Sequence, residues 1–312
     1  MLTPELYSVA SQYMGYLAEH GKSYITNEEF TARKALYMET DRLVNEHNAT
    51  ESSFKLGHNK FSDFTDYERS QLLGYIAPDT EQEPVILEPT NADSVNWVTA
   101  GAVTPVKDQG QCGSCWTFSS TGALEGAHQI ATGTLLSFSE QQIVDCANLS
   151  HGYPSFGCNG GNQSVAFKYL KSHKAELESV YKYTAKNGTC AYDADSATAV
   201  EVSAYTTVKK DDVTQMKAAV AQQPVSVSIE ADKAVFQQYT SGVFDSAECG
   251  TKLDHATLVV GYGTENGEDY WLMKNSWGTS WGEEGYMRLA IEDGVGICAI
   301  QSAPLYPNQR GN

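Results

Sequence analysis

The stretch Gln109-Gly-Gln-Cys-Gly-Ser-Cys-Trp-Thr-Phe118 contains two cysteines, Cys112 and Cys115, and the second is followed at once by an apolar run. This run predicts a helix over Trp116–Ile130, with Gly133 as a left-handed stop. Cys115 then lies at the helix N-terminus, where unpaired backbone N–H groups and the helix dipole favour a thiolate. Because the thiolate is the nucleophilic form of cysteine, Cys115 is a candidate nucleophile.

The length and charge of the chain narrow the possible functions. Its 312 residues suffice for two domains, each with a core, and an extension. The formal net charge of −18 argues against nucleic acid or an anionic membrane as partner. No apolar run approaches the roughly eighteen residues that span a bilayer. The segment Met1–His20 lacks the basic and apolar regions of a signal peptide, so the signal is expected to be missing here, unless the protein is not secreted.

The remaining cysteines indicate an oxidising compartment. Seven are present, and six of them can pair in fifteen ways, which leaves one free thiol. Four Asn-x-Ser/Thr triplets, at Asn48, Asn148, Asn162 and Asn187, are compatible with glycosylation during secretion. We therefore expect a protein of the secretory pathway, located in the lysosome or phagosome or outside the cell.

Two alternative interpretations of the Cys112–Cys115 pair are disfavoured. A zinc site would need a second Cys-x-x-Cys or His pair at suitable spacing, and none follows. A thioredoxin-like redox pair should follow a buried strand, but Ala102–Val106 is interrupted by Pro105. A catalytic cysteine that needs no metal or cofactor is the favoured interpretation.

Residues 1–75 are predicted to be mostly helical, in the stretches Glu5–His20 and Glu28–Asn48. Six residues of the second stretch largely share one helical face. They are Glu29, Arg33, Tyr37, Thr40, Val44 and Asn48. Glu29 and Arg33 form an i,i+4 ion pair in the favourable order, and on spacing alone this is an amphipathic helix with a solvated pair.

The pattern changes along the rest of the chain. Residues 76–92 contain three prolines and several acidic residues, which predicts an exposed linker with a maturation cut between Asp79 and Asp93. Residues 93–205 have the pattern of helix and loop. Four strands are predicted beyond residue 224, over Val225–Ile229, Ala256–Val260, Tyr270–Lys274 and Gly285–Leu289. Helices first and strands later predict an α+β protein of two lobes.

A cysteine nucleophile requires a base, and seven histidines are available. Three lie before the linker, and three others lie in surface-like segments or too far along the Cys115 helix. His255 alone opens a buried strand in the opposite lobe, so it is the predicted base.

Several of these segments resemble one known family. Cys112-Gly-Ser-Cys-Trp116 resembles the nucleophile signature of papain-like cysteine proteases, and Lys274-Asn-Ser-Trp-Gly278 is similar to their KNSWG motif. The six-residue face of Glu28–Asn48 resembles the ERFNIN pattern of cathepsin L-like propeptides, and Gly57-x-Asn59-x-Phe61-x-Asp63 resembles the GNFD motif that follows it. The resemblance covers nearly the whole chain.

The resemblance implies the papain-like α+β fold. A helical L lobe, about 91–205, would contain the central helix that begins at Cys115, and a β-barrel-like R lobe would cover about 206–312. Residues 1–90 would be an inhibitory propeptide, helical over residues 1–75 and followed by an extended linker over residues 76–90. The mature peptidase would start near Asn91.

The resemblance also implies the roles of individual residues. Cys115 attacks the substrate, His255 is the base, and Asn275 orients the imidazole beneath Trp277, while the Gln109 amide and the Cys115 backbone N–H form the oxyanion hole. The implied substrate-binding residues are Gly160, Gly161, Asn162, Gln163, Ser228, Leu253, Asp254, Trp277 and Ala303. The implied disulfides are Cys112–Cys158, Cys146–Cys190 and Cys249–Cys298, which leave Cys115 free.

The pocket for the second residue before the scissile bond (P2) looks more polar than is usual in the family, because Asn162, Gln163 and Ser228 occupy it. An apolar P2 residue would still be accepted through Leu253 and Ala303, with weaker discrimination. The alternative is that the side chains at 162 and 163 point to solvent.

The expected function is that of a cathepsin L-like cysteine endopeptidase in zymogen form. Its partners would be peptide substrates, its own propeptide and cystatin-type inhibitors, and the chain is expected to be a monomer. A catalytically inactive storage or binding relative and a stand-alone inhibitor module are the competing classes. An exopeptidase is disfavoured because the loop Ala147–Gly157 is short and lacks paired histidines.

Overall fold

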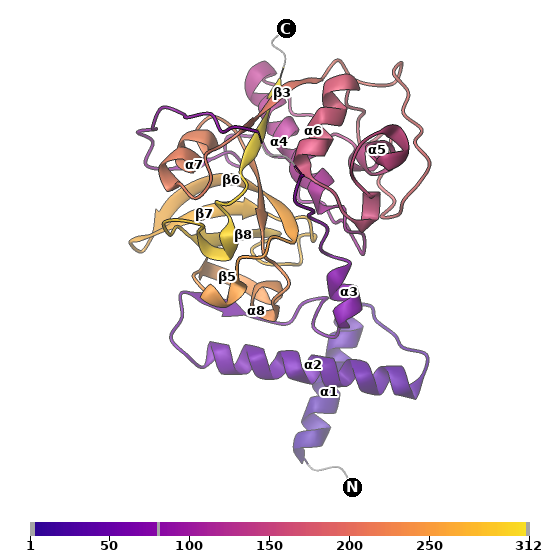
Figure 1. Ribbon diagram of the computed structural model, residues 1–312. Coiled ribbons are helices and arrows are strands. Elements are labelled where there is room, and N and C mark those ends of the chain that lie inside the picture. Colours follow the sequence, from indigo (N-terminus) through magenta and orange to yellow (C-terminus); the bar gives the residue numbers. More distant parts are fainter. Residues whose placement is uncertain (1–3, 80–81, 310–312) are drawn as a thin grey trace.

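The computed structural model describes residues 4–79 and 82–309, and it comprises a propeptide region and two lobes (Figure 1). The propeptide helices α1 (Pro4–Glu19) and α2 (Asn27–Asn48) lie together at one end of the molecule. Helix α3 (Asp66–Ser70) leads from them toward the junction of the two larger lobes. The expected helical stretches of the propeptide are therefore present, within one residue at each end.

The L lobe is built around helix α4 (Cys115–Thr132), which begins at the predicted nucleophile and ends at Gly133 with a φ of 76°. Every residue from Cys115 to His128 is buried, because α4 packs against helices and strands on several sides. The other helices of this lobe are α5 (Glu140–Cys146) and α6 (Gln163–Ser172).

The R lobe is a largely antiparallel sheet, in which the strands follow the order β1-β5-β8-β7-β6-β4-β9-β3, and β2 also pairs with β6. The strands are β1 (Phe54–Leu56), β2 (Val95–Asn96), β3 (Val202–Thr207), β4 (Val225–Ile229), β5 (Tyr239–Phe244), β6 (His255–Glu265), β7 (Glu268–Lys274), β8 (Tyr286–Ala290) and β9 (Leu305–Gln309). Helices α7 (Val213–Val220) and α8 (Ala234–Gln237) pack beside it.

The four predicted strands are all present, but strand β6 is longer than predicted. It continues to Glu265, because β6 and β7 form one hairpin whose last pair is Glu265 with Glu268. Asn266 and Gly267 make the turn with positive φ angles of 53° and 87°, which suits a tight hairpin. The polar composition of this segment gives little strand signal in the sequence.

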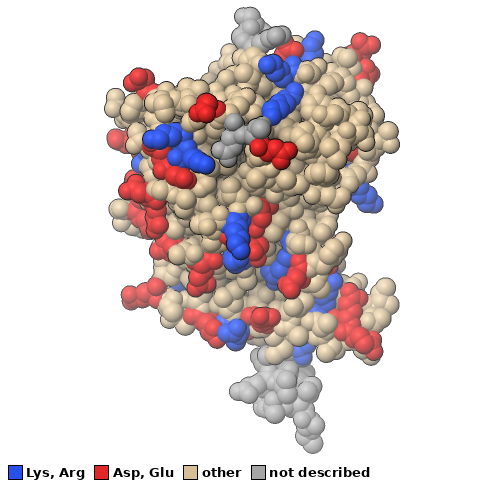
Figure 2. All heavy atoms as spheres, viewed as in Figure 1, with Lys and Arg blue, Asp and Glu red and all other residues tan. Residues whose placement is uncertain are grey.

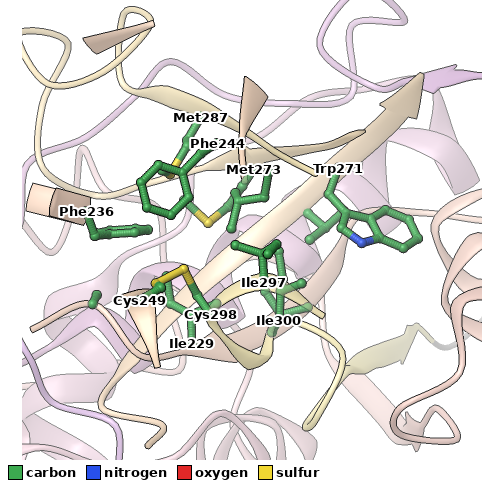
Figure 3. Packing of buried hydrophobic residues seen from close by; sticks show 14 of the residues in the cluster. Ile229, Phe236, Phe244, Cys249, Trp271, Met273, Met287, Ile297, Cys298 and Ile300 are labelled. Atoms are coloured by element: carbon green, nitrogen blue, oxygen red, sulfur yellow. A yellow bond between two sulfur atoms is a disulfide. The ribbon is translucent and has the colours of Figure 1, made fainter. Parts of the chain in front are cut away.

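The R-lobe core surrounds the disulfide between Cys249 and Cys298 (Figure 3). Aromatic and sulfur-containing side chains, among them Phe236, Phe244 and Met273, fill the space between the sheet and this disulfide. The core therefore holds the segments around Cys249 and Cys298 against the sheet, in which strand β6 begins with His255.

The propeptide is not entirely helical, which corrects the sequence prediction in one place. Residues 54–56 form β1, an antiparallel edge strand that pairs with β5 of the R lobe, with Phe54 opposite Gly242. Asn48 fixes this strand, because its side-chain amide donates to the Leu56 carbonyl at 2.7 Å and its oxygen accepts from the Leu56 N–H at 3.1 Å. The strand is too short to carry a periodic signal of its own.

Charged side chains are scattered over the face shown in Figure 2, where red acidic groups are more common than blue basic ones and the basic groups do not merge into one patch. Within residues 4–79 and 82–309, no helix has the length and apolar character needed to cross a membrane.

Candidate active site

Three predicted residues from separate elements meet at the junction of the lobes. Cys115 is the first residue of α4, His255 is the first residue of β6, and Asn275 directly follows β7. The Ala256 N–H lies 3.4 Å from the Cys115 Sγ, and His255 Nε2 lies 2.8 Å from the Asn275 Oδ1. These three residues meet because two strands of one lobe face a helix of the other.

The tautomer of His255 follows from its partner. Asn275 Oδ1 is also fixed as an acceptor by the Ser276 N–H at 2.8 Å, so the Nε2 of His255 must donate to it. This leaves Nδ1 as the basic nitrogen, and it makes no hydrogen bond among the described residues. Trp277 stacks on the imidazole with a centroid distance of 4.7 Å and an interplanar angle of 29°, which shields the His255–Asn275 hydrogen bond from water.

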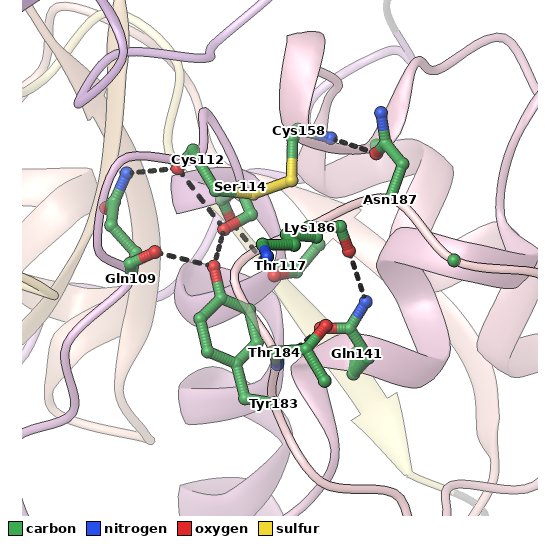
Figure 4. The surroundings of a disulfide bond; sticks show 12 residues. Gln109, Cys112, Ser114, Thr117, Gln141, Cys158, Tyr183, Thr184, Lys186 and Asn187 are labelled. Carbon is green, nitrogen blue, oxygen red and sulfur yellow. Dashed lines mark hydrogen bonds between the residues drawn. A yellow bond between two sulfur atoms is a disulfide. The ribbon is translucent and has the colours of Figure 1, made fainter. Parts of the chain in front are cut away.

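Gln109 is held from both lobes, and Figure 4 shows its hydrogen bonds with Cys112 and Tyr183. Its backbone N–H donates to the Ser276 carbonyl at 2.8 Å, and the Ser276 hydroxyl donates to its Oε1 at 2.7 Å. On the other side, the Tyr183 hydroxyl donates to the Gln109 carbonyl at 2.7 Å and lies 2.6 Å from the Ser114 hydroxyl. The Gln109 Nε2 is thereby turned toward the cleft, as an oxyanion-hole donor requires.

Sequence reasoning missed both Ser276 and Tyr183. Ser276 lies between Asn275 and Trp277, so its position in the motif was a usable signal. Tyr183 is separated from Gln109 by 74 residues, and no pattern connects the two.

The propeptide occupies the cleft with its backbone. The Leu72 carbonyl accepts from Gln109 Nε2 at 2.9 Å, which places a peptide oxygen on the predicted oxyanion donor. The next residues pair with the walls: Gly74 N–H donates to the Asp254 carbonyl, and Gly161 N–H donates to the Gly74 carbonyl, each at 2.9 Å. A Cβ at Gly74 would lie 1.9 Å from the Gly113 carbonyl oxygen, so only glycine allows this approach.

Burial shifts the pKa of both Cys115 and His255. Loss of solvent raises the pKa of the Cys115 thiol to about 12 and lowers the pKa of His255 to about 4. Both side chains are fully buried. In this form a neutral thiol therefore faces a neutral imidazole at physiological pH. Burial also raises the pKa of the neighbouring Asp254 to about 7.

Some of the predicted substrate-binding residues lie against the propeptide, namely those just before and at the start of α6. Gly161 pairs with the propeptide backbone, and a Cβ at Gly160 would lie 2.9 Å from the Gly74 carbonyl oxygen. Asn162, Gln163 and Ala303 line a cavity of about 110 Å³.

Ser228 and Leu253 are placed differently from these. Ser228 lies behind Gln163 and accepts a hydrogen bond from its Nε2 at 3.0 Å, so it supports the pocket without lining it. Leu253 is half-buried and is absent from the lining of this cavity, so it does not act as an apolar wall in the zymogen. Asn162 and Gln163 are only 5% and 0% exposed, so their side chains do not point to solvent in the zymogen.

The predicted Glu29–Arg33 pair is present, and Arg33 has a second partner that lies closer. Tyr37, Thr40 and Val44 form the buried face of α2. Arg33, however, makes its main ion pair with Glu68, and Arg33 NH2 lies 2.8 Å from Glu68 Oε1. In the predicted i,i+4 pair, Glu29 lies 3.6 Å from Arg33, and its side chain is 43% exposed. Glu68 of α3 lies closer to the Arg33 guanidinium than Glu29 does, because the capping box with Thr65 holds the Glu68 carboxylate in place.

The GNFD-like turn docks on the enzyme. Asn59 donates from its side chain to the Gln237 carbonyl at 2.8 Å, and Phe61 packs edge-on against Trp277. The Gly57 Cα approaches Thr240 so closely that a Cβ would lie 2.8 Å from its methyl group. Asp63 is fully buried. Its carboxylate partners are Tyr13, Tyr16, Lys22 and Tyr24.

The six paired cysteines form Cys112–Cys158, Cys146–Cys190 and Cys249–Cys298, and Cys115 is free. Cys112 therefore has a covalent partner, which removes it from any zinc or redox pair with Cys115. The first bridge ties the start of α4 to the turn that leads into Gly160 and Gly161 (Figure 4).

Comparison with known proteins agrees with this geometry. The family model for papain family cysteine proteases matches residues 91–308, and the cathepsin propeptide inhibitor domain matches residues 13–68. A probable cysteine protease of Arabidopsis thaliana is 41% identical over 96% of this chain, which spans 66% of that relative's length. A digestive cysteine proteinase of Homarus americanus is 40% identical, with 93% of each chain covered.

Solved proenzymes share the fold. A digestive procathepsin L2 proteinase from Tenebrio molitor larval midgut superposes with a TM-score of 0.89 at 35% identity, covering 96% of this chain and 99% of that one. A recombinant stem bromelain precursor gives 0.87 at 34% identity, with the same coverage. The chain therefore belongs to the papain family of cysteine proteases and carries the inhibitory propeptide of that family.

Proposed function

We propose that this chain is the zymogen of a cysteine endopeptidase in which Cys115, His255, Asn275 and Gln109 perform the chemistry. The observation that supports it most strongly is the Leu72 carbonyl on the Gln109 amide, beside Cys115. A peptide carbonyl bound at this donor is the group that a protease must polarise. No metal or organic cofactor enters the proposal.

The reaction follows from the arrangement once the propeptide leaves. Water then reaches the pair, so the pKa of Cys115 falls, the pKa of His255 rises, and the proton moves from Sγ to Nδ1. The thiolate attacks the peptide carbonyl, while Gln109 Nε2 and the Cys115 N–H stabilise the oxyanion. His255 protonates the leaving amine, and water releases the acyl group. Asn275 keeps Nδ1 directed at the sulfur throughout.

Activation is proposed to occur by cleavage within residues 79–93, which gives a mature chain from near Asn91 and a propeptide of residues 1–90. Acid is proposed to assist, because ion pairs of the propeptide contain carboxylates. The Arg33–Glu68 pair is the strongest support: burial opposes ionisation of Glu68, but hydrogen bonds from Arg33 and Thr65 outweigh it and lower its pKa. This contribution to stability is lost as the pH falls through the folded-state pKa.

Endopeptidase activity is favoured over exopeptidase activity because the Ala147–Gly157 loop is short. Passage through the secretory pathway, a lysosomal or extracellular location, glycosylation, a monomeric state and inhibition by cystatin-type proteins are further elements of the proposal. The six paired cysteines support an oxidising compartment.

The test is incubation of the purified chain at acid pH, with and without a thiol-alkylating reagent, followed by sequencing of the products. We expect a shortened chain that begins within residues 79–93, and peptidase activity that appears together with it. Alkylation should block both. Processing that continues after Cys115 is alkylated, with no peptidase activity in either sample, would contradict the proposal.

A further inference from the structure

The asparagines of the four Asn-x-Ser/Thr triplets have different surroundings in the folded chain. Glycosylation joins a bulky sugar to the side-chain nitrogen Nδ2, so this nitrogen must face solvent. In all four the side-chain oxygen accepts a backbone N–H, which identifies the other amide atom as the nitrogen. The surroundings of that nitrogen can therefore be compared at Asn48, Asn148, Asn162 and Asn187.

At Asn48 and Asn148 the side-chain nitrogen is used inside the protein. Asn48 Nδ2 donates to the Leu56 carbonyl at 2.7 Å, and Asn148 Nδ2 donates to the Asp145 carbonyl at 2.6 Å. Both asparagines are half-buried. A sugar on either nitrogen would have to fit against the backbone carbonyl that the nitrogen binds, so the fold disfavours both sites.

Asn162 lies in the cleft, beneath the propeptide. Its Nδ2 donates to the Ile76 carbonyl at 3.0 Å, and the residue is only 5% exposed. A sugar there would push the propeptide backbone away from Gly161, whose carbonyl accepts the Ile76 N–H at 2.8 Å. A chain that carried a sugar at Asn162 before folding could not reach this structure.

Asn187 has the opposite arrangement (Figure 4). Its Oδ1 accepts the Cys158 N–H at 2.7 Å and packs so closely on Gly157 that a Cβ on that glycine would clash with it. The side-chain nitrogen points away from Cys158, and it has no acceptor among the described residues. Residues 186–189 are all exposed and contain no helix or strand, so this nitrogen lies on a surface loop.

We propose that Asn187 is the glycosylation site of this protein and that the other three triplets are unmodified in the folded zymogen. This inference rests on the passage through the secretory pathway proposed above. In the reaction, Nδ2 loses a proton and forms a bond to the anomeric carbon of an oligosaccharide, while the bond from that carbon to a lipid-linked diphosphate breaks. The product keeps Oδ1, so the hydrogen bond from the Cys158 N–H survives.

The test expresses the full chain in a eukaryotic host behind a cleavable signal peptide, as Cys115→Ala so that it stays uncleaved. An N-glycan amidase in heavy-oxygen water converts each glycosylated asparagine of the secreted, folded chain into a labelled aspartate, which peptide mass spectrometry locates. We expect the label at Asn187 and at none of the other three asparagines. A label at any of those three, or no label at all, would overturn the inference.

Two matched variants separate the triplet from the fold. Thr189→Ala removes the triplet of Asn187 but leaves the Asn187 side chain, which binds Cys158, in place. It should lose the whole mass of the glycan. Ser150→Ala removes the triplet of Asn148 and should keep that mass in full. A glycan that survives in Thr189→Ala, or one that disappears in Ser150→Ala, would contradict the assignment.

The activity of the wild-type chain, assayed after activation, keeps this inference distinct from the proposed function. An activated enzyme that hydrolyses peptides but has no glycan at Asn187 would overturn the inference and leave the peptidase function standing. A chain that is glycosylated at Asn187 and hydrolyses no peptide would do the reverse.

Discussion

The two ends of the propeptide hold the enzyme in different ways. The helical end contacts the R lobe through side chains, such as Phe61 on Trp277 and Asn59 on the Gln237 carbonyl, and the backbone pairing of β1 with β5 lies next to these contacts. The cleft end, residues 72–76, uses mostly its own backbone, which pairs with Asp254 and Gly161.

This difference separates recognition from inhibition. Backbone hydrogen bonds are available to any extended peptide, so the cleft end can bind as a substrate would. This pairing therefore contributes little sequence specificity. The side chains of Phe61 and Asn59, in contrast, fit one surface of the enzyme. We infer that the helical end provides specificity and that the cleft end provides the blockade, with the covalent connection raising its effective concentration. The following predictions test this division, from the largest effect to the smallest.

Replacement of the nucleophile should remove the chemistry and leave both ends docked. Cys115→Ala is expected to abolish peptidase activity, because the small substitution deletes the thiol and little packing. Activity assays and a thermal melt of the full-length chain check this. His255→Ala should be nearly as damaging, while Asn275→Ala should lose less because it orients the base and transfers no proton. Peptide hydrolysis by Cys115→Ala would refute the assignment.

Loss of a side chain at the helical end should release the propeptide. Phe61 is 1% exposed, and deletion of such a ring costs about 3–5 kcal/mol. In the inactive Cys115→Ala background, we expect Phe61→Ala to speed removal of residues 1–90 by an added protease roughly 100-fold. Tyr75→Ala is the matched control at the cleft end, since its backbone pairing survives. If both variants speed removal of the propeptide equally, the proposed division between recognition and inhibition is wrong.

A Cβ inside the cleft should weaken the blockade while the helical end stays bound. At Gly74 it would lie 1.9 Å from the Gly113 carbonyl oxygen, and such overpacking costs about 1–3 kcal/mol. Gly74→Ala should therefore speed alkylation of Cys115 in the uncleaved zymogen by about 10-fold. Gly15→Ala is the control, because nothing lies within 4 Å of its added carbon. Unchanged alkylation in Gly74→Ala would show that this backbone contact is not what closes the site.

Acid should loosen the helical end through specific pairs. The pKa of Glu68 is lowered in the folded state, so its stabilisation is present above the unfolded value near 4.3 and is lost as the pH falls through the lower folded value. We expect the melting temperature of the Cys115→Ala zymogen to fall between pH 7 and pH 3.5. In Glu68→Gln the decline should be a few degrees smaller, at about 2–4 °C for each kcal/mol.

Two further variants sharpen the pH experiment. Asp63→Asn replaces the buried carboxylate that four donors share, so it should lower the melting temperature already at pH 7. Glu29→Gln is the control, because its 3.6 Å pair with Arg33 is exposed and contributes little. A propeptide that stays docked and equally stable at pH 3.5, or profiles that are identical in all variants, would exclude these pairs as the acid-sensitive element.

The sequence alone was sufficient to predict the features that depend on residues close together in the chain. The helix from Cys115 to Gly133 could be predicted because its apolar run and its glycine stop are contiguous. His255 and Asn275 could be predicted because each lies in a short motif whose chemistry requires those residue types. The propeptide helices followed from their period, and the resemblance supplied the disulfide pairing that spacing alone left open.

Only the tertiary structure decided which distant groups meet. Tyr183 on Gln109, Glu68 on Arg33 and strand β1 on β5 join segments far apart in sequence, and no periodicity records such pairs. Nor could the sequence predict the burial of Cys115, which raises the pKa of its thiol in the zymogen. Gln163 could be recognised as a polar residue from the chain alone, but the direction of its side-chain carbonyl depends on the Val227 carbonyl behind it.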